Sequence, residues 1–420
     1  MRTLILLRLS ARSVGRNLRR SVLTAAAMVV GLALLILSRA LADGTHEQWI
    51  DSAVALGAGH VAIQAPGYLE TRKLEDRLDA AAAERATGAV DASLDSSVLR
   101  AWVPRLSVGG LASSASSALP VQILGVDPAA EPAFSALQER LEEGRYLEPG
   151  DRLQAFVGIE LARRLELEIG SRFVVTAQTA TGDVQGQLVR VAGTFRTAIP
   201  EMDEGLIHIP IETAQGWLEA PGAMTSVAMM LETSEVTELA ISRLEATLEG
   251  DDALDVLGWQ ETSPELADAI RIDDVGDYIF HTILFAIVAL AILNSVMMAV
   301  LGRRREFGIL QAMGLTGPET GFVVFFEGLF VTAASGFVGV ILGYAVTWGF
   351  FGDGLDFSAL MDSDMSFSGT IIDPVIYPTF SIDQILVSVY SIVIIGTLAS
   401  IYPALRATRF DVAEAMKFDR

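Results

Sequence analysis

Four long apolar stretches decide what this chain can fold into. They cover residues 21–42, 279–302, 321–351 and 382–402. A helix needs roughly 20 predominantly apolar residues to cross a hydrocarbon core about 30 Å thick, and each stretch reaches that length. We therefore expect four transmembrane helices. Hydrophobic residues make up 51% of the 420-residue chain and charged residues only 20%, which argues against an ordinary soluble enzyme.

The charges divide the chain into two compartments. The net charge is −22, yet residues 43–277 hold 40 acidic and 16 basic residues, a net charge of −24, so the remainder is slightly positive. This acidity argues against nucleic-acid binding, which depends largely on Lys and Arg contacting phosphates. The chain has no cysteine, which excludes disulfides, thiolate metal sites and cysteine nucleophiles. A large domain outside the cytoplasm must then be stabilised by its core alone.

The flanks of the apolar stretches predict their direction. Six arginines and no acid precede the first stretch, Arg303, Arg304 and Arg305 close the second, and four basic residues follow the last. Residues 352–384 carry six acidic residues and no basic one. The positive-inside rule places both termini in the cytoplasm. The expected order is a cytoplasmic amphipathic helix (1–20), the first span (21–42), an extracytoplasmic domain (43–278), the second span (279–302), a cytoplasmic turn (303–320), the third span (321–351), an extracytoplasmic loop (352–381), the fourth span (382–402) and a cytoplasmic tail (403–420).

The segment before the first span combines two helical periodicities. Apolar residues step at helical spacing beside an arginine stripe at Arg8, Arg12, Arg16 and Arg20. This pattern predicts a basic amphipathic helix on the anionic cytoplasmic leaflet, and the alternative is a solvated arginine-rich tail. A cleaved signal peptide is the competing interpretation of the first span, because Ala40-Leu41-Ala42 fits the cleavage rule. The long patterned segment argues against it.

Residues 43–278 have the pattern of a mixed α+β domain. Strands are predicted at 173–176, 188–195, 206–210 and 227–231, and helices at 160–167 and 235–248. We interpret the Gly/Ser/Ala-rich residues 109–118 as a loop that separates an inserted lobe, about 119–209, from the rest. Ser263-Pro264 is a helix start signal, so the second span is expected to continue outward as a stalk from about residue 264.

The usual catalytic motifs do not occur in the sequence. Lys73 and Lys417 are its two lysines and neither follows glycine, so no phosphate-binding P-loop exists. Residues 57–62 fit G-x-G-x-x-A, but they follow a predicted helix and precede a predicted strand, the reverse of the dinucleotide-binding order. We interpret them as a helix-terminating glycine turn. The four histidines are scattered. We therefore expect no catalytic residue, metal or cofactor in this chain.

Polar and small residues within the spans are the next candidates. Glu327 lies about two turns into the third span, where a carboxylate is costly. It could contact headgroups or an arginine of the triple, or couple transport to protons. Asn294 could hydrogen-bond a neighbouring helix. Small residues four apart form two rows in the third span, which suggest close helix packing and a dimer interface: Gly328, Thr332 and Gly336, and Ser335, Gly339 and Gly343.

The turn between the second and third spans contains a short helical element. Thr316 and Glu319 have capping-box spacing, so one helix ends near Gly314 and the third span begins at Thr316. An apolar strip of Phe307, Leu310 and Met313 is expected on this element. Either the membrane surface or a partner protein should cover it.

The motifs of this turn and of the tail resemble ABC-transporter permeases of the MacB/FtsX/LolC type. The run Arg304-Arg305-Glu306-Phe307-Gly308-Ile309-Leu310-Gln311-Ala312-Met313-Gly314 resembles the family's cytoplasmic signature, and residues 402–409 with 414–416 resemble its C-terminal motif. Glu327 matches a glutamate common in the family. Residues 125–128, 144–147 and 195–204 extend the resemblance into the outer domain, and residues 59–68 are most similar to lipoprotein-releasing LolC/LolE subunits.

The resemblance implies a mechanotransmission subunit in the inner membrane rather than an enzyme. Such a permease dimerises with a second, identical or different permease copy and binds a separate ABC ATPase, which carries ATP and Mg. The ATPase would dock on Arg304, Arg305, Glu306, Phe307, Gly308, Leu310, Met313 and Gly314. The implied work is lipoprotein release, with membrane lipid and a periplasmic chaperone as further partners. MacB-like export with an adaptor and an outer-membrane channel, and FtsX-like control of a cell-wall hydrolase, are the alternatives.

The predicted topology can be tested with reporter fusions. Fusions at Arg20, Ser114, Gly314 and the C-terminus should report cytoplasm, outside, cytoplasm and cytoplasm, because every arginine-rich flank falls on one side. An externally exposed C-terminus would contradict this topology.

Overall fold

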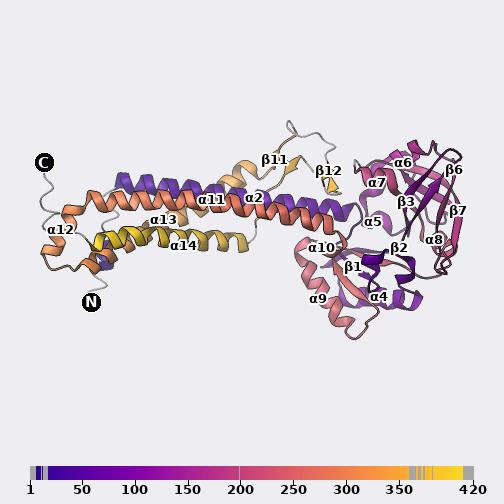
Figure 1. Ribbon diagram of the computed structural model, residues 1–420, viewed down its shortest axis with the longest axis horizontal. Coiled ribbons are helices and arrows are strands. Elements are labelled where there is room, and N and C mark those ends of the chain that lie inside the picture. Colours follow the sequence, from indigo (N-terminus) through magenta and orange to yellow (C-terminus); the bar gives the residue numbers. More distant parts are fainter. Residues whose placement is uncertain are drawn as a thin grey trace. The chain divides into compact units, whose positions relative to one another are not determined.

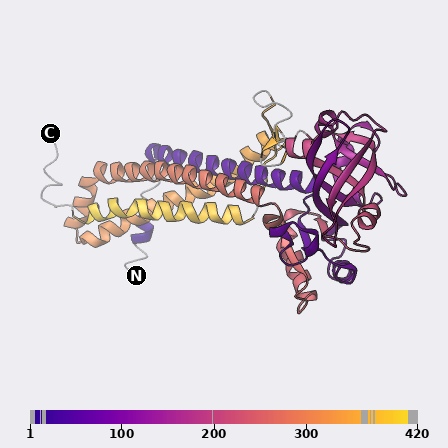
Figure 2. The same cartoon turned by 45° about the vertical axis from the view of Figure 1, so that its right-hand side comes forward.

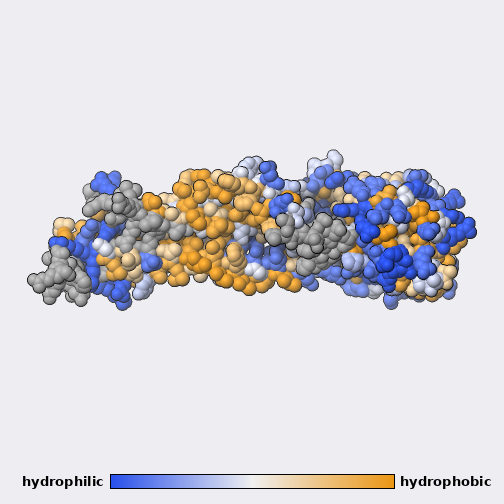
Figure 3. All heavy atoms as spheres, turned by 90° about the horizontal axis from the view of Figure 1, so that it is seen from above, coloured by the Kyte–Doolittle hydropathy of each residue, from blue (hydrophilic) through white to orange (hydrophobic). Residues whose placement is uncertain are grey.

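Long apolar helices make up most of one of the two compact units of the chain (Figure 1). The computed structural model describes residues 6–10, 12, 18–197, 199–358, 366–367, 370–371, 374–380 and 382–409. Within them, four helices are long and apolar enough to cross a membrane: α2 (Leu18–Ala55), α11 (Pro264–Gly302), α13 (Gly317–Phe351) and α14 (Ile382–Thr408). Figure 3 shows hydrophobic residues gathered over these helices. The predicted amphipathic helix 1–20 lies mostly outside the described residues.

The first unit comprises Met1–Thr45, Ile272–Phe357 and Val375–Arg420, and the second comprises His46–Arg271 and Ser358–Pro374. α11 begins at Pro264, where the expected stalk begins, and it runs 39 residues without a break. The short helix α12 (Arg304–Ala312) follows it. The small strands β11 (Leu355–Asp356) and β14 (Val375–Ile376) pair with each other, as do β12 (Ser366–Phe367) and β13 (Thr370–Ile371).

Small residues allow the helices of the first unit to pack closely. Gly328 on α13 lies against Ser400 on α14, and Gly396 on α14 lies against Thr332 on α13. The other row faces α2: a Cβ on Gly343 would lie 2.8 Å from Cδ1 of Ile36. Both rows are therefore occupied by helices of the same chain. The dimer interface that we expected in the third span is wrong for these rows, because α2 and α14 already cover them.

The second unit contains a ten-stranded sheet. In the sequence, all ten strands come after α2 and before α11. Six of its strands close into a ring, in the order β2–β3–β8–β5–β7–β6 and back to β2, and Figure 2 shows them curving round. The strands of the ring are β2 (Leu99–Ser113), β3 (Ala118–Val126), β5 (Gln154–Gly158), β6 (Arg172–Gln178), β7 (Val184–Phe195) and β8 (Leu206–Pro210). Ile123, Val157 and Val175 inside this barrel are fully buried.

A second lobe extends from the other edge of β2. Its strands are β9 (Ser226–Leu231), β1 (Val61–Gln64) and β10 (Asp255–Gly258), while β4 (Leu141–Gly144) pairs with β7 of the barrel. Val90 of α4 (Ala80–Ser93) and Leu244 of α9 (Thr237–Thr247) pack in a core of their own with β1 and β9. The remaining helices are α3 (Tyr68–Thr71), α5 (Glu131–Phe134), α6 (Ile159–Arg164), α7 (Pro200–Gly205), α8 (Ile211–Trp217) and α10 (Trp259–Thr262), with 3-10 turns at Leu74–Asp76, Ala136–Arg140 and Ser234–Val236.

The predicted strands and helices of this domain agree with the structure, but the predicted loop at 109–118 does not. β2 continues to Ser113, and the turn to β3 spans only residues 114–117. The small residues serve close strand packing instead, since a Cβ on Gly110 would collide with the carbonyl oxygen of Thr176 on β6. The barrel therefore includes β2, which the predicted lobe at 119–209 leaves out. The glycine turn at residues 57–62 is confirmed, because α2 ends at Ala55 and β1 begins at Val61.

The packing of α2 on α13 predicts the effect of a bulky residue at Gly343. Gly343→Leu should destabilise the helical unit by about 1–3 kcal/mol, the usual cost of overpacking, because Ile36 and Ala33 leave no room for it. Thermal unfolding of the purified protein in detergent measures the loss. Gly349→Leu on the same helix is the matched control, since its Cβ would meet nothing within 4 Å. Equal melting temperatures for the two variants would contradict this packing.

Candidate functional site

Arg303 lies at the corner where three helices meet. α11 ends at Gly302 and α12 begins at Arg304, so Arg303 connects them. Its Nη1 donates hydrogen bonds to both carboxylate oxygens of Glu327 on α13, at 3.0 and 2.8 Å. Its Nε donates to Oε2 of Glu306 on α12 at 3.0 Å. One guanidinium therefore joins the end of α11 to both α12 and α13.

This corner is largely closed to solvent. The side chains of Arg303 and Glu327 are 13% and 15% exposed, and the guanidinium carbon lies 5.0 Å from the centre of the Phe307 ring. Charge-assisted hydrogen bonds are stronger than neutral ones, and removing one partner of a buried pair costs about 3–5 kcal/mol because the other charge is left uncompensated. Glu327, which we expected to contact headgroups or an arginine of the triple, contacts Arg303.

The far end of α12 is also tied to α13. Thr316 is the N-cap of α13, its hydroxyl accepts a hydrogen bond from the backbone N–H of Glu319, and the Glu319 carboxylate accepts one from the backbone N–H of Thr316 at 2.8 Å. This is the capping box that the sequence predicts. Nε2 of Gln311 on α12 donates to Oγ1 of Thr320 on α13 at 3.2 Å. α12 is thus attached to α13 directly through Gln311 at its far end, and through Arg303 at its first turn.

The exposed face of α12 differs from the predicted apolar strip. Phe307 is 1% exposed and packs in the core of the helical unit, and Leu310 is partly buried against the same core. Ile309 and Met313, four residues apart, are instead 44% and 71% exposed, with Arg305 exposed one turn earlier. The strip is therefore wrong at Phe307 and Leu310, because this chain's own helices cover those positions. The available apolar surface is Ile309 with Met313.

The other predicted site residues divide between buried and exposed positions. Arg304 is half-buried, Gly308 is buried and Gly314 is exposed at the end of α12. Asn294 is exposed on α11, and among the described residues its side chain has no hydrogen-bond partner, so the expected interhelical hydrogen bond is not made within this chain. The packing positions on α13 are all buried: Gly328, Thr332, Ser335, Gly336, Gly339 and Gly343.

Sequence reasoning missed Arg303 and Ile309 as site residues, and Gly396 with Ser400 as packing residues. Arg303 was expected only as one of three arginines that Glu327 could contact, and it was not named as a site residue. Gly396 and Ser400 are four apart, the same spacing as the rows that were recognised. For Ile309 no signal was available, because a nine-residue helix does not reveal which side its neighbour covers.

Comparisons with known proteins match both parts of the chain. The FtsX-like permease C-terminal family matches residues 278–412, and the MacB-like periplasmic core domain family matches residues 21–247. The lipoprotein-releasing system transmembrane protein LolC from Xylella fastidiosa is 26% identical over 314 residues, which cover 71% of this chain and 73% of that protein. LolC from Neisseria meningitidis is 26% identical over 337 residues, covering 76% and 78%.

A solved structure is also among the matches. The periplasmic region of MacB from Actinobacillus actinomycetemcomitans is 12% identical, with a TM-score of 0.34, and the match covers 49% of this chain and 91% of that one. The MacB-like match alone covers more than half of the 420 residues. Four apolar helices and these relatives describe a multi-pass membrane protein with an extracytoplasmic domain. The chain belongs to the family of ABC transporter permeases of the MacB, FtsX and LolC type.

Proposed function

We propose that this chain transmits ATP-driven movement from a separate ABC ATPase to its extracytoplasmic domain, and that the work done there is the release of lipoproteins from the inner membrane. The observation that carries the proposal is the Arg303 corner. α12 is bonded to α13 through Gln311 and Thr320, and its first turn is bonded to Arg303 at the end of α11, which in turn binds Glu327 of α13. A displacement of α12 should therefore move the ends of α11 and α13 to which it is bonded.

The route of the movement follows the helices that meet at the corner. α11 is one unbroken helix from Pro264 to Gly302, and a rigid element with two positions is the physical requirement for coupling between distant sites. With both termini in the cytoplasm, α12 faces the compartment that holds ATP. ATP and Mg would be bound by the partner ATPase, and a second permease copy, identical or different, would complete the complex.

Lipoproteins are the proposed substrate because the curated relatives that match about three quarters of this chain are named for lipoprotein release. A periplasmic chaperone would receive the released lipoprotein. Two other activities are compatible with the same coupling to an ATPase. They are export with an adaptor protein and regulation of a cell-wall hydrolase.

The exposed apolar face of α12, Ile309 with Met313, is the proposed docking surface for the ATPase, and a double substitution there should uncouple the complex. Ile309→Asp with Met313→Asp places two carboxylates on the exposed apolar face of α12 without touching the Arg303 corner. Desolvating those carboxylates in a protein interface is costly, so co-purification with a P-loop ATPase from native membranes should fall at least tenfold. Leu239→Asp is the matched control, because Leu239 is a similarly exposed apolar residue, 46% exposed, on helix α9.

The same variants test the substrate. Proteoliposomes containing the permease, its ATPase and a triacylated protein should release that protein to a soluble acceptor when ATP is added, and the double variant should not. Normal ATPase binding by the double variant would contradict the docking surface. Normal binding and hydrolysis in the wild type without any release would contradict the lipoprotein substrate alone.

A further inference from the structure

Helix α11 has two apolar faces, and the described part of the chain covers only one of them. Val288, Ile292 and Val296 are buried in the core of the helical unit. The opposite face carries an exposed residue at every third or fourth position from 272 to 301, which places these residues along one side of the helix. This outer stripe includes Ile272, Ile283, Ile287, Leu290, Asn294 and Leu301.

The outer stripe is too long for lipid alone to cover. From Ile272 to Leu301 it extends about 44 Å at about 1.5 Å per residue, whereas the hydrocarbon core is about 30 Å thick. With Gly302 and the arginine triple at the cytoplasmic surface, the excess lies at the other end. Ile272 is 74% exposed there, next to Asp273 and Asp274, and such charged groups are costly in hydrocarbon. A continuous cover for the stripe therefore has to be protein.

Asn294 is the strongly polar member of the outer stripe. It is exposed, and among the described residues its amide has no hydrogen-bond partner. Along the helix it lies about 12 Å from Gly302, so its short side chain does not reach the headgroups. An amide surrounded by hydrocarbon is costly. A partner for the stripe therefore has to offer a hydrogen-bond donor and acceptor at this depth.

A second copy of α11, parallel and in register, offers these groups at the required depth. A carboxamide has two N–H donors and an oxygen acceptor, so two Asn294 side chains beside a twofold axis can bond to each other. A single asparagine in an apolar seam fixes the register of a parallel helix pair. Thr282 and Ala286, four residues apart and both exposed beside the stripe, allow the two backbones to approach.

We propose that two copies of this chain pair along the outer stripes of their α11 helices, with the two Asn294 amides hydrogen-bonded across the twofold axis. The pair buries Ile283, Ile287 and Leu290 within the membrane and continues to Ile272 outside it. This makes the second permease copy of the proposed function an identical chain, and it rests on that function only for the presence of a second copy. Neither ATPase docking nor lipoprotein release enters the test.

Oxidative cross-linking of single-cysteine variants in native membranes tests the pairing. The chain contains no cysteine, so one introduced cysteine can link this chain to itself only between two copies. Ile272→Cys and Leu290→Cys should each give a cross-linked dimer. Phe337→Cys on α13 and Leu398→Cys on α14 are the matched controls. These positions are 71% and 62% exposed on other helices, and both variants should remain uncross-linked.

The dissociation constant of the dimer tests the amide pair. It is measured by energy transfer between copies labelled at Leu239→Cys in detergent micelles. Asn294→Leu, which removes the amide at similar volume, should raise the constant about three- to tenfold, as expected for one hydrogen bond within a membrane. Asn294→Gln keeps an amide and should retain most of the affinity. Met298→Leu, one turn away on the same stripe, is the matched control and should leave the constant unchanged.

Three results would overturn the proposal. One is equally strong cross-linking of Phe337→Cys, because the copies would then meet at random in the membrane. Another is a stripe that gives no cross-link although the protein is folded, as expected if lipid or a different permease subunit covers it. The third is a dimer whose dissociation constant Asn294→Leu leaves unchanged, which would remove the amide from the interface. The melting temperature of each variant in detergent shows whether it is folded.

Discussion

The ion pair between Arg303 and Glu327 is the interaction on which the arrangement of the helical unit depends. Both groups are mostly buried, and each would be costly there alone, so the pair fixes the end of α11 against α13. Glu306 and the Phe307 ring complete the contacts of the guanidinium and attach α12 to the same point. A surface helix of nine residues would have little stability by itself. These contacts with Arg303 hold α12 in a fixed position in the helical unit.

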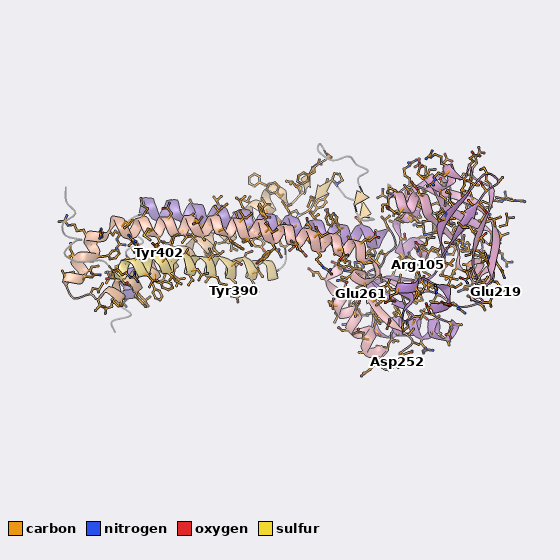
Figure 4. The ribbon with its side chains drawn as sticks, in the orientation of Figure 1. Arg105, Glu219, Asp252, Glu261, Tyr390 and Tyr402 are labelled. Carbon is orange, nitrogen blue, oxygen red and sulfur yellow. The ribbon has the colours of Figure 1, made fainter. Side chains whose placement is uncertain are left out.

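The small residues of the spans explain why this unit is compact without a second copy. Glycine, serine and threonine on α13 and α14 let the two helices approach each other, and α2 packs against the other face of α13. Less of the surface of α11 is covered by the other helices, since its Ile283, Ile287 and Leu290 are more than half exposed. Tyr390 and Tyr402 on α14, labelled in Figure 4, are also exposed. These surfaces are available to lipid or to another permease subunit.

The sequence predicted the features that depend on local patterns and missed those that depend on distant ones. Hydropathy located the four apolar helices, and the capping box located the start of α13 at Thr316. The barrel could not be predicted, because its closure depends on the pairing of Gly110 with Ala177, 67 positions later in the chain. The same holds for the site. The depth of Glu327 suggested a contact with an arginine of the triple, but the identity of that arginine and the exposure of Ile309 follow from how α12 packs against α13.

We propose that movement of α12 is transmitted through the Arg303 corner, and one distance measurement tests this transmission directly. The chain has no cysteine, so spin labels at Leu239→Cys and Leu405→Cys are unique, and both positions are exposed. In the reconstituted complex, ATP should change the distance distribution between these labels. Arg303→Ala and Glu327→Ala should each remove that change while ATP hydrolysis continues, and exchanging the two charges should restore part of it. An ATP-driven change that persists in both single variants would contradict the account.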